Sequence, residues 1–208
     1  MDTTLIKVEY VISFSDALFA FSITLMAVSI GIPHFPENIS ESELTTKLGQ
    51  SVIPDIILYV ISFLVVGMYW IAYHRIFEYI RRVNITLVWL NLLLLLFISL
   101  VAYFTGVLAV YNTYRIVVIS YASVLSVAGF TLCIIWWYST HKRHLVDKDL
   151  DSYLVRYYLL RGFVSPIVFI SSIGISFLDV QAAQYFWIVN LPAYMIINKI
   201  HKPHLPKL

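Results

Sequence analysis

Asp16 is the residue of this sequence most clearly placed to do chemistry, because it is a carboxylate near the middle of an apolar run, residues 8–32. An apolar run of about 20 residues is long enough to cross a bilayer as a helix. An acid inside such a helix costs about 2.5–3.5 kcal/mol on insertion scales, so it is normally paired or hydrated and marks a functional site. Two roles are open to Asp16: hydrogen bonding that holds neighbouring helices in place, or binding of a cation in a pore.

Polar residues of two later apolar runs lie at a depth that matches Asp16. At 1.5 Å per residue, Asp16 lies about 12 Å along its helix, and Asn91 lies at a similar depth in the third run. Trp70 and His74 lie at the end of the second run that faces the same side. We therefore expect these groups to form hydrogen bonds that hold the first three helices together. The predicted network consists of Ser15 or its neighbour Ser13, Asp16, Trp70, His74 and Asn91.

A second set of residues occupies another face of the first helix. The set is Phe21, Thr24, Leu25 and Val28. At 100° per residue, these positions fall between about 80° and 180° from Asp16. If this face lines a pore, the carboxylate lies behind the lining, which favours the role of holding helices in place. Taken alone, a face of this composition is more often ordinary helix packing.

The composition of the whole chain indicates a membrane protein. Of the 208 residues, 60% are hydrophobic and 12% charged, and the mean hydropathy is +0.83, which is too apolar for a soluble domain. We expect an all-α integral membrane protein with six transmembrane helices in a single domain, residues 1–208. The six apolar runs that predict these helices are residues 8–32, 53–73, 86–108, 117–138, 158–178 and 185–197.

Positive charge is divided unequally between the two sides of this predicted membrane domain. Of the fourteen Lys and Arg residues, all but Lys47 and Arg115 fall on the side that also holds both termini. The positive-inside rule therefore places both termini in the cytoplasm, and we expect the protein in the cell membrane. The net charge of +2 gives no reason to expect a nucleic acid as partner.

Two local motifs lie just before the second apolar run. Ser40 and Glu43 have the spacing of a capping box, which predicts a short surface helix ending near Gly49. Pro54 suits the first turn of the second transmembrane helix, where its missing N–H costs little. The sequence therefore predicts two separate helices in this region.

No pattern in the sequence indicates an enzyme, a metal site or a cofactor. Cys133 is a lone cysteine, which excludes an internal disulfide and a site of several cysteines. The two histidine pairs with i,i+3 spacing lie in Lys-rich segments typical of solvated surface, and they are His141 with His144 and His201 with His204. A TVGYG selectivity filter is also absent, so any ion selectivity must come from side chains.

Residues 8–110 resemble the first three helices of the transmembrane protein 175 family of potassium channels. The residues that carry this resemblance are Phe14-Ser15-Asp16 followed by Phe19, Ala20, Ile23 and Thr24, then Ile61-Ser62-Phe63-Leu64, Tyr69-Trp70, His74-Arg75, and Trp89-Leu90-Asn91. In the family, an arginine precedes Phe-Ser-Asp by three intervening residues, and here that position is Tyr10. Asp16 would then lack a charged partner unless His74 supplies one.

The resemblance implies a homotetramer whose first helices surround a central pore for potassium and related monovalent cations. It implies that Phe21, Leu25 and Val28 form the constriction, a hydrophobic gate, and that Thr24 offers a hydroxyl layer. Phe21 departs from the Ile or Leu usual in the family. Conduction would be passive, and the predicted hydrogen-bond network would hold the lining helices in place.

Two other functional classes stay open at this point. A proton-coupled secondary transporter could use Asp16 and His74 as a relay. Such a carrier would normally show repeated halves with broken helices at the site, which this sequence lacks. A membrane protein that conducts no ion and has only a structural role is the third class.

Overall fold

The computed structural model describes residues 6–30, 36 and 39–200, and this part of the chain is helical throughout its length apart from short connections. The seven α-helices described are α1 (Val8–Ser29), α2 (Glu41–Phe77), α3 (Ile85–Tyr111), α4 (Arg115–Thr140), α5 (Ser152–Ser176), α6 (Val180–Phe186) and α7 (Asn190–Ile200). Short 3-10 turns follow α4 at His141–Arg143 and join α6 to α7 at Trp187–Val189. The prediction of an all-α chain is confirmed.

Five helices of the described chain are long and apolar enough to cross a membrane, where the sequence predicted six. These five are α1 to α5, and each contains most of the corresponding predicted run, although residues 31 and 32 of the first run lie outside the described residues. The run at 185–197 is not one helix, because a 3-10 turn separates α6 from α7. Pro192 explains the break: it cannot donate to the carbonyl of Ile188, and its ring crowds that carbonyl.

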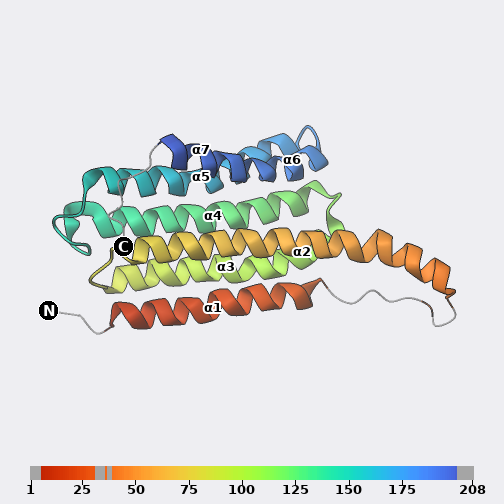
Figure 1. The fold of residues 1–208 in the computed structure, drawn as a ribbon, viewed down its shortest axis with the longest axis horizontal. Coiled ribbons are helices and arrows are strands. Elements are labelled where there is room, and N and C mark those ends of the chain that lie inside the picture. The colour runs from red at the N-terminus through yellow and green to blue at the C-terminus, as the bar shows by residue number, and fades with distance from the viewer. Residues whose placement is uncertain (1–5, 31–35, 37–38, 201–208) are drawn as a thin grey trace.

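The second helix is continuous over 37 residues, so the predicted separate surface helix before it is wrong. Ser40 is the N-cap, and its side chain accepts a hydrogen bond from the backbone N–H of Glu43 at 3.3 Å, as the capping motif predicts. Pro54 lies inside α2, not in its first turn. One proline deprives only one carbonyl of its donor, which a membrane helix tolerates. The N-terminal part of α2 therefore projects beyond the other helices (Figure 1).

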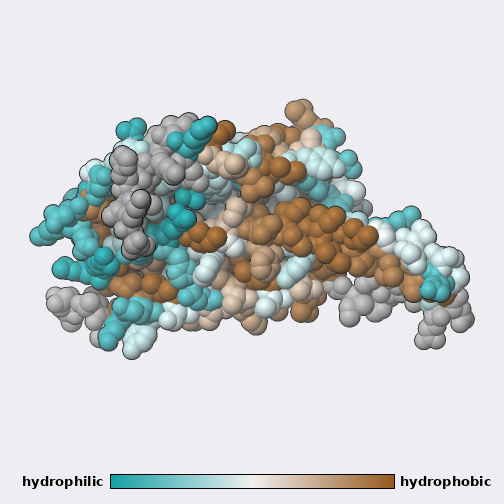
Figure 2. Space-filling model, in the orientation of Figure 1, coloured by the Kyte–Doolittle hydropathy of each residue, from teal (hydrophilic) through white to brown (hydrophobic). Residues whose placement is uncertain are grey.

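The long helices lie side by side in one bundle, with α1 at one side and α5 to α7 at the other (Figure 1). The helix α3 packs against both α1 and α4, whereas α1 packs against α3 and α2. Hydrophobic residues cover much of the visible surface over the middle of the bundle, and hydrophilic residues gather at the end that carries the α2–α3 and α4–α5 connections (Figure 2). This distribution matches a bilayer-embedded middle with a polar end.

The polar end of the bundle is held by contacts between the two connections. The backbone N–H of Arg81 donates to the carbonyl of Leu145 at 2.9 Å, and Arg81 Nε lies 2.9 Å from Asp147 Oδ2. Ile80 and Val146 form an isolated antiparallel bridge beside them. These contacts fix the C-terminal end of α2, which carries Trp70 and His74.

Candidate functional site

The first helix has one face buried in the bundle and one face exposed. The buried residues follow a spacing of three and four and are Val11, Ser15, Phe19, Ser22 and Met26. On the other face, the exposed fractions are 57% for Phe21, 37% for Leu25 and 74% for Val28, and Thr24 is also exposed. Phe21, Thr24, Leu25 and Val28 follow i, i+3, i+4, i+7, so they form one stripe along the helix. We call this stripe the free face of α1.

Asp16 is bound by two aromatic side chains of α2. The indole Nε1 of Trp70 donates to Asp16 Oδ1 at 2.8 Å, and His74 Nε2 lies 2.7 Å from the same oxygen. An ionised carboxylate can only accept hydrogen bonds, so Nε2 must carry the hydrogen in this contact. Trp70 and His74 are four residues apart and therefore share one face of α2. His74 thus supplies the partner that Asp16 would otherwise lack.

Ser15 is the centre of a second, fully buried cluster. Its Oγ accepts hydrogen bonds from Tyr73 OH at 2.8 Å and from Asn91 Nδ2 at 3.0 Å, and donates to the carbonyl of Val11 at 2.8 Å. Ser15 and Tyr73 are 0% exposed and Asn91 is 2% exposed. One hydroxyl therefore joins α1, α2 and α3 where no water can replace it.

The structure brings all five residues of the predicted network together, but as two adjacent clusters. Asp16 contacts Trp70 and His74, while Asn91 bonds to Ser15 and not to Asp16. Ser13, the alternative to Ser15, lies on the exposed side of α1. Residue spacing predicts the depth of Asn91 but not its rotation about the α3 axis, which decides its partner.

Tyr73 is the member of the site that the sequence reasoning missed. Its hydroxyl bonds to Ser15, its ring stacks on Phe77 at a centroid distance of 4.1 Å, and it packs against Phe19 at 5.7 Å. A signal existed, because Tyr73 is three residues after Trp70 and adjacent to His74. A tyrosine near the end of a membrane span is, however, equally typical of the aromatic belt at the interface.

The free face of α1 offers one kind of polar group. The hydroxyl of Thr24 donates to the carbonyls of Phe21 at 2.9 Å and Ala20 at 3.2 Å within its own helix. Its oxygen keeps lone pairs that point away from these bonds. Thr24 can therefore accept from water or coordinate a cation, while its apolar neighbours cannot.

Close packing fixes the far end of α1 against α3. A Cβ atom at Gly106 would lie 2.5 Å from the backbone oxygen of Ser29 and 3.0 Å from its Cβ. Only glycine leaves room for this approach, so the last turn of α1 lies directly on α3. The helix is thus held at both ends, by the polar clusters near its start and by backbone contact near its end.

The remaining candidate ligands do not form a site in the described part of the chain. Within residues 6–30, 36 and 39–200, no group of three or more His, Cys, Asp or Glu side chains is arranged to hold a metal ion. His144 Nδ1 lies 2.9 Å from the carbonyl of His141, so this pair makes a local turn contact. His201 and His204 lie outside the described residues. Cys133 is buried.

These features define an all-α integral membrane protein. One face of its first helix is held by contacts with α2 and α3, and another face is exposed. The sequence model of the family described as "Endosomal/lysosomal potassium channel TMEM175" matches residues 10–102. The chain is 30% identical over 171 residues to a protein of Streptomyces collinus named a potassium channel, covering 80% of this chain and 81% of the relative. A protein of Chamaesiphon minutus with the same kind of name is 25% identical over 171 residues, covering 81% and 83%.

The solved structures agree with this relationship at the level of the fold. The crystal structure of a lysosomal potassium-selective channel TMEM175 homologue from Chamaesiphon minutus superposes with a TM-score of 0.74 at 21% identity, covering 92% of this chain and 98% of that one. The chain belongs to the TMEM175 family of potassium channels. It is therefore a member of an ion-channel family and not an enzyme.

Proposed function

We propose that this protein is a potassium-permeable monovalent cation channel formed by four copies of the chain, with the α1 helices around one central pore. The observation that carries the proposal is the free face of α1: an exposed stripe of Phe21, Leu25 and Val28 with the hydroxyl of Thr24 between them. The relatives that are named potassium channels support the class of transported ion.

The contacts on the opposite side of α1 support this orientation. Ser15 directs its hydroxyl toward α2 and α3, so the helix cannot rotate without breaking buried hydrogen bonds. Asp16 adds partly exposed contacts with Trp70 and His74 of α2. Breaking the buried bonds leaves unpaired donors in an apolar environment, which costs about 1–3 kcal/mol for each donor. The anchors therefore keep Thr24 and its apolar neighbours turned outward, toward the position we assign to the pore axis.

The free face supplies the two elements that a passive pore needs. Phe21, Leu25 and Val28 from four chains would form a narrow apolar segment, which gates ions by expelling water. The Thr24 hydroxyls would replace part of the hydration shell of a potassium ion beside that segment. Conduction through such a pore needs no coupling to an energy source, so potassium flux would follow the electrochemical gradient. We place the channel in the cell membrane with both termini in the cytoplasm, following the distribution of Lys and Arg.

A proton-coupled carrier is the alternative that Asp16 and His74 first suggested. The relatives named channels do not favour it. In addition, the Asp16 carboxylate of α1 and the His74 imidazole of α2 contact each other at 2.7 Å where α1 meets α2, and neither residue belongs to the free face. Single-channel recording separates the classes, because discrete open levels indicate a channel, whereas flux that needs a gradient of a second solute indicates a carrier.

Substitution of Phe21 by alanine tests the assigned constriction. Removing four phenyl rings widens and wets the narrow segment, so potassium flux into liposomes should rise about tenfold or more, which corresponds to a barrier lowered by about 1.4 kcal/mol. Phe177→Ala is the matched control, because Phe177 is an exposed phenylalanine at the C-cap of α5. Unchanged or lower flux in Phe21→Ala, with normal assembly on size-exclusion chromatography, would contradict the assignment.

A further inference from the structure

Two cavities lie between α2 and the C-terminal helices. The larger has a volume of about 1070 Å³ and the smaller about 370 Å³. Met68, Ile71 and Leu191 line both, so the two cavities adjoin and form one slot along α2. Their volumes are in the range of ordinary ligand-binding cavities. Neither cavity is lined by a residue of the free face of α1, but Ile23 of α1 and Trp70, which bonds to Asp16, line the larger one.

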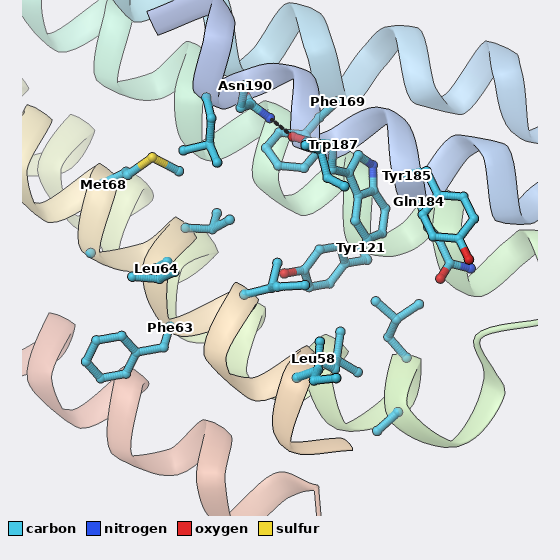
Figure 3. A pocket seen from close by; sticks show the side chains of 18 of the residues that line it. Leu58, Phe63, Leu64, Met68, Tyr121, Phe169, Gln184, Tyr185, Trp187 and Asn190 are labelled. Atoms are coloured by element: carbon cyan, nitrogen blue, oxygen red, sulfur yellow. Dashed lines mark hydrogen bonds between the residues drawn. The ribbon is translucent and has the colours of Figure 1, made fainter. Parts of the chain in front are cut away.

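The larger cavity is lined mainly by apolar side chains, with the carboxylate of Asp55 also in its lining, and it opens to the side of the bundle. In Figure 3, Leu64 and Met68 of α2 lie across the cavity from Tyr121, Phe169 and Trp187. Residues at its edge are exposed, with Leu64 at 57% and Leu191 at 58%. The opening is thus at membrane depth, where hydrocarbon chains are the surrounding solvent. An acyl chain fits the chemistry of this chamber.

The smaller cavity differs because it carries positive charge. Arg75 of α2 and Arg161 of α5 both line it. Arg161 donates from Nη1 to Tyr157 OH at 3.4 Å, and its guanidinium lies 5.7 Å from the ring centroid of Tyr194. Among the residues that the structure describes, neither arginine forms an ion pair with a carboxylate.

The position of Arg161 makes an unneutralised charge costly. It lies three residues inside the apolar run 158–178, about 5 Å along the helix axis, and is only partly exposed. A charge that is partly removed from water is costly unless it is paired. Two arginines at one cavity favour an anion that reaches the slot from outside the described chain, and the adjoining chamber favours an anion that carries a hydrocarbon chain.

We propose that a phospholipid with an anionic headgroup, of the phosphatidylglycerol class, binds in this slot. Its phosphodiester lies between Arg75 and Arg161, and one acyl chain occupies the larger cavity. Basic pockets between membrane helices are typical binding sites for anionic headgroups. The planar guanidinium groups suit phosphate oxygens, because each can donate two parallel hydrogen bonds. A free phosphate ion would leave the apolar chamber unfilled, which is why we assign a lipid.

Native mass spectrometry of the full-length protein in detergent tests the headgroup contact. Dioleoyl phosphatidylglycerol should bind at least about fivefold more tightly than dioleoyl phosphatidylcholine. Arg161→Gln and Arg75→Gln should each lower the affinity for phosphatidylglycerol about tenfold, the loss expected for a charge-assisted contact. Arg156→Gln is the matched control, because Arg156 is exposed on the same helix as Arg161 and lines neither cavity. It should leave the affinity unchanged.

Substitution at two glycines tests the acyl-chain contact. Gly67 lines the larger cavity, and a Cβ there would meet nothing within 4 Å, so Gly67→Leu introduces a side chain at the chamber wall with no clash at its Cβ. Gly174 is equally open but lines neither cavity, which makes Gly174→Leu the control. Only Gly67→Leu should weaken binding of dioleoyl phosphatidylglycerol. The soluble headgroup analogue glycerol 3-phosphate should not displace the lipid at millimolar concentration.

Several outcomes would overturn the proposal. Equal affinity for phosphatidylglycerol and phosphatidylcholine would do so, as would an affinity for phosphatidylglycerol that Arg75→Gln and Arg161→Gln leave unchanged. Displacement of the lipid by glycerol 3-phosphate alone would also contradict the proposal, and so would a slot closed to lipid by a second copy of the chain. Circular dichroism and size-exclusion chromatography check the fold of each variant. Arg75 is exposed, so Arg75→Gln keeps the test valid if Arg161→Gln does not fold.

Discussion

The cluster around Ser15 makes a quantitative prediction about how three helices are held together. Ser15→Ala removes the acceptor of two buried donors, Tyr73 OH and Asn91 Nδ2. Each buried donor left without an acceptor costs about 1–3 kcal/mol, so Ser15→Ala should lower the free energy of unfolding by about 3 kcal/mol. Tyr73→Phe removes one donor and leaves Ser15 with its bond from Asn91, so the loss should be only about 1 kcal/mol.

The double variant Ser15→Ala/Tyr73→Phe gives the most informative comparison. It removes Ser15 Oγ and one of the two donors that depend on it, so Asn91 Nδ2 is the one donor newly left unpaired, beside Asn91 Oδ1, which has no hydrogen-bond partner in the wild type either. We expect a loss of about 2 kcal/mol, which makes the double variant more stable than Ser15→Ala alone. The assay is unfolding by denaturing detergent from mixed micelles, followed by circular dichroism.

A matched control separates this effect from the general cost of removing a hydroxyl. Ser120 of α4 bonds only to the carbonyl of Ile116 in its own helix at 2.8 Å, so Ser120→Ala should change stability by less than about 0.5 kcal/mol. Additive losses for Ser15→Ala and Tyr73→Phe in the double variant would refute the reasoning, because they would show that the two groups do not share one hydrogen bond.

Two further predictions concern the positions that hold α1. Asp16→Asn keeps an oxygen but loses the charge that His74 and Trp70 contact at 2.7 and 2.8 Å. The tetramer fraction on size-exclusion chromatography and the potassium flux in liposomes should therefore both fall. Wild-type values for both would count against the role of Asp16 in holding α1. Gly106→Ala places a Cβ 2.5 Å from a backbone oxygen of α1 and should lower the free energy of unfolding by about 1–3 kcal/mol, whereas Gly174→Ala, which meets open space, should not lower it. Equal effects of the two glycine variants would show that α1 and α3 do not approach closely.

The sequence was sufficient for the parts of the structure that depend on depth and local spacing. Asp16 and its partners Trp70 and His74 could be predicted because an acid in an apolar helix needs a partner at the same depth, and an i,i+4 pair presents two side chains on one face. The Ser40 N-cap depends only on residues within one turn. These inferences need no knowledge of how the helices rotate against one another.

The parts that sequence reasoning missed depend on packing between helices. Long helices that are apolar on all sides give no indication of which face is buried, so the partner of Asn91 and the role of Tyr73 could not be read from periodicity. The slot beside α2 arises from the spacing of helices distant in sequence. The continuity of α2 could not be predicted from Pro54, because proline suits the first turn of a helix and is also tolerated inside a membrane helix, which can accommodate one missing donor.

The central claim is that the free face of α1 lines the pore, and a cryo-electron microscopy structure of the assembled protein in a lipid nanodisc tests it most directly. The account predicts a fourfold axis surrounded by α1, with Phe21, Leu25 and Val28 as the side chains nearest to it and Asp16 turned toward α2. An assembly with another helix around the axis, or a single chain without a conduit, would contradict it.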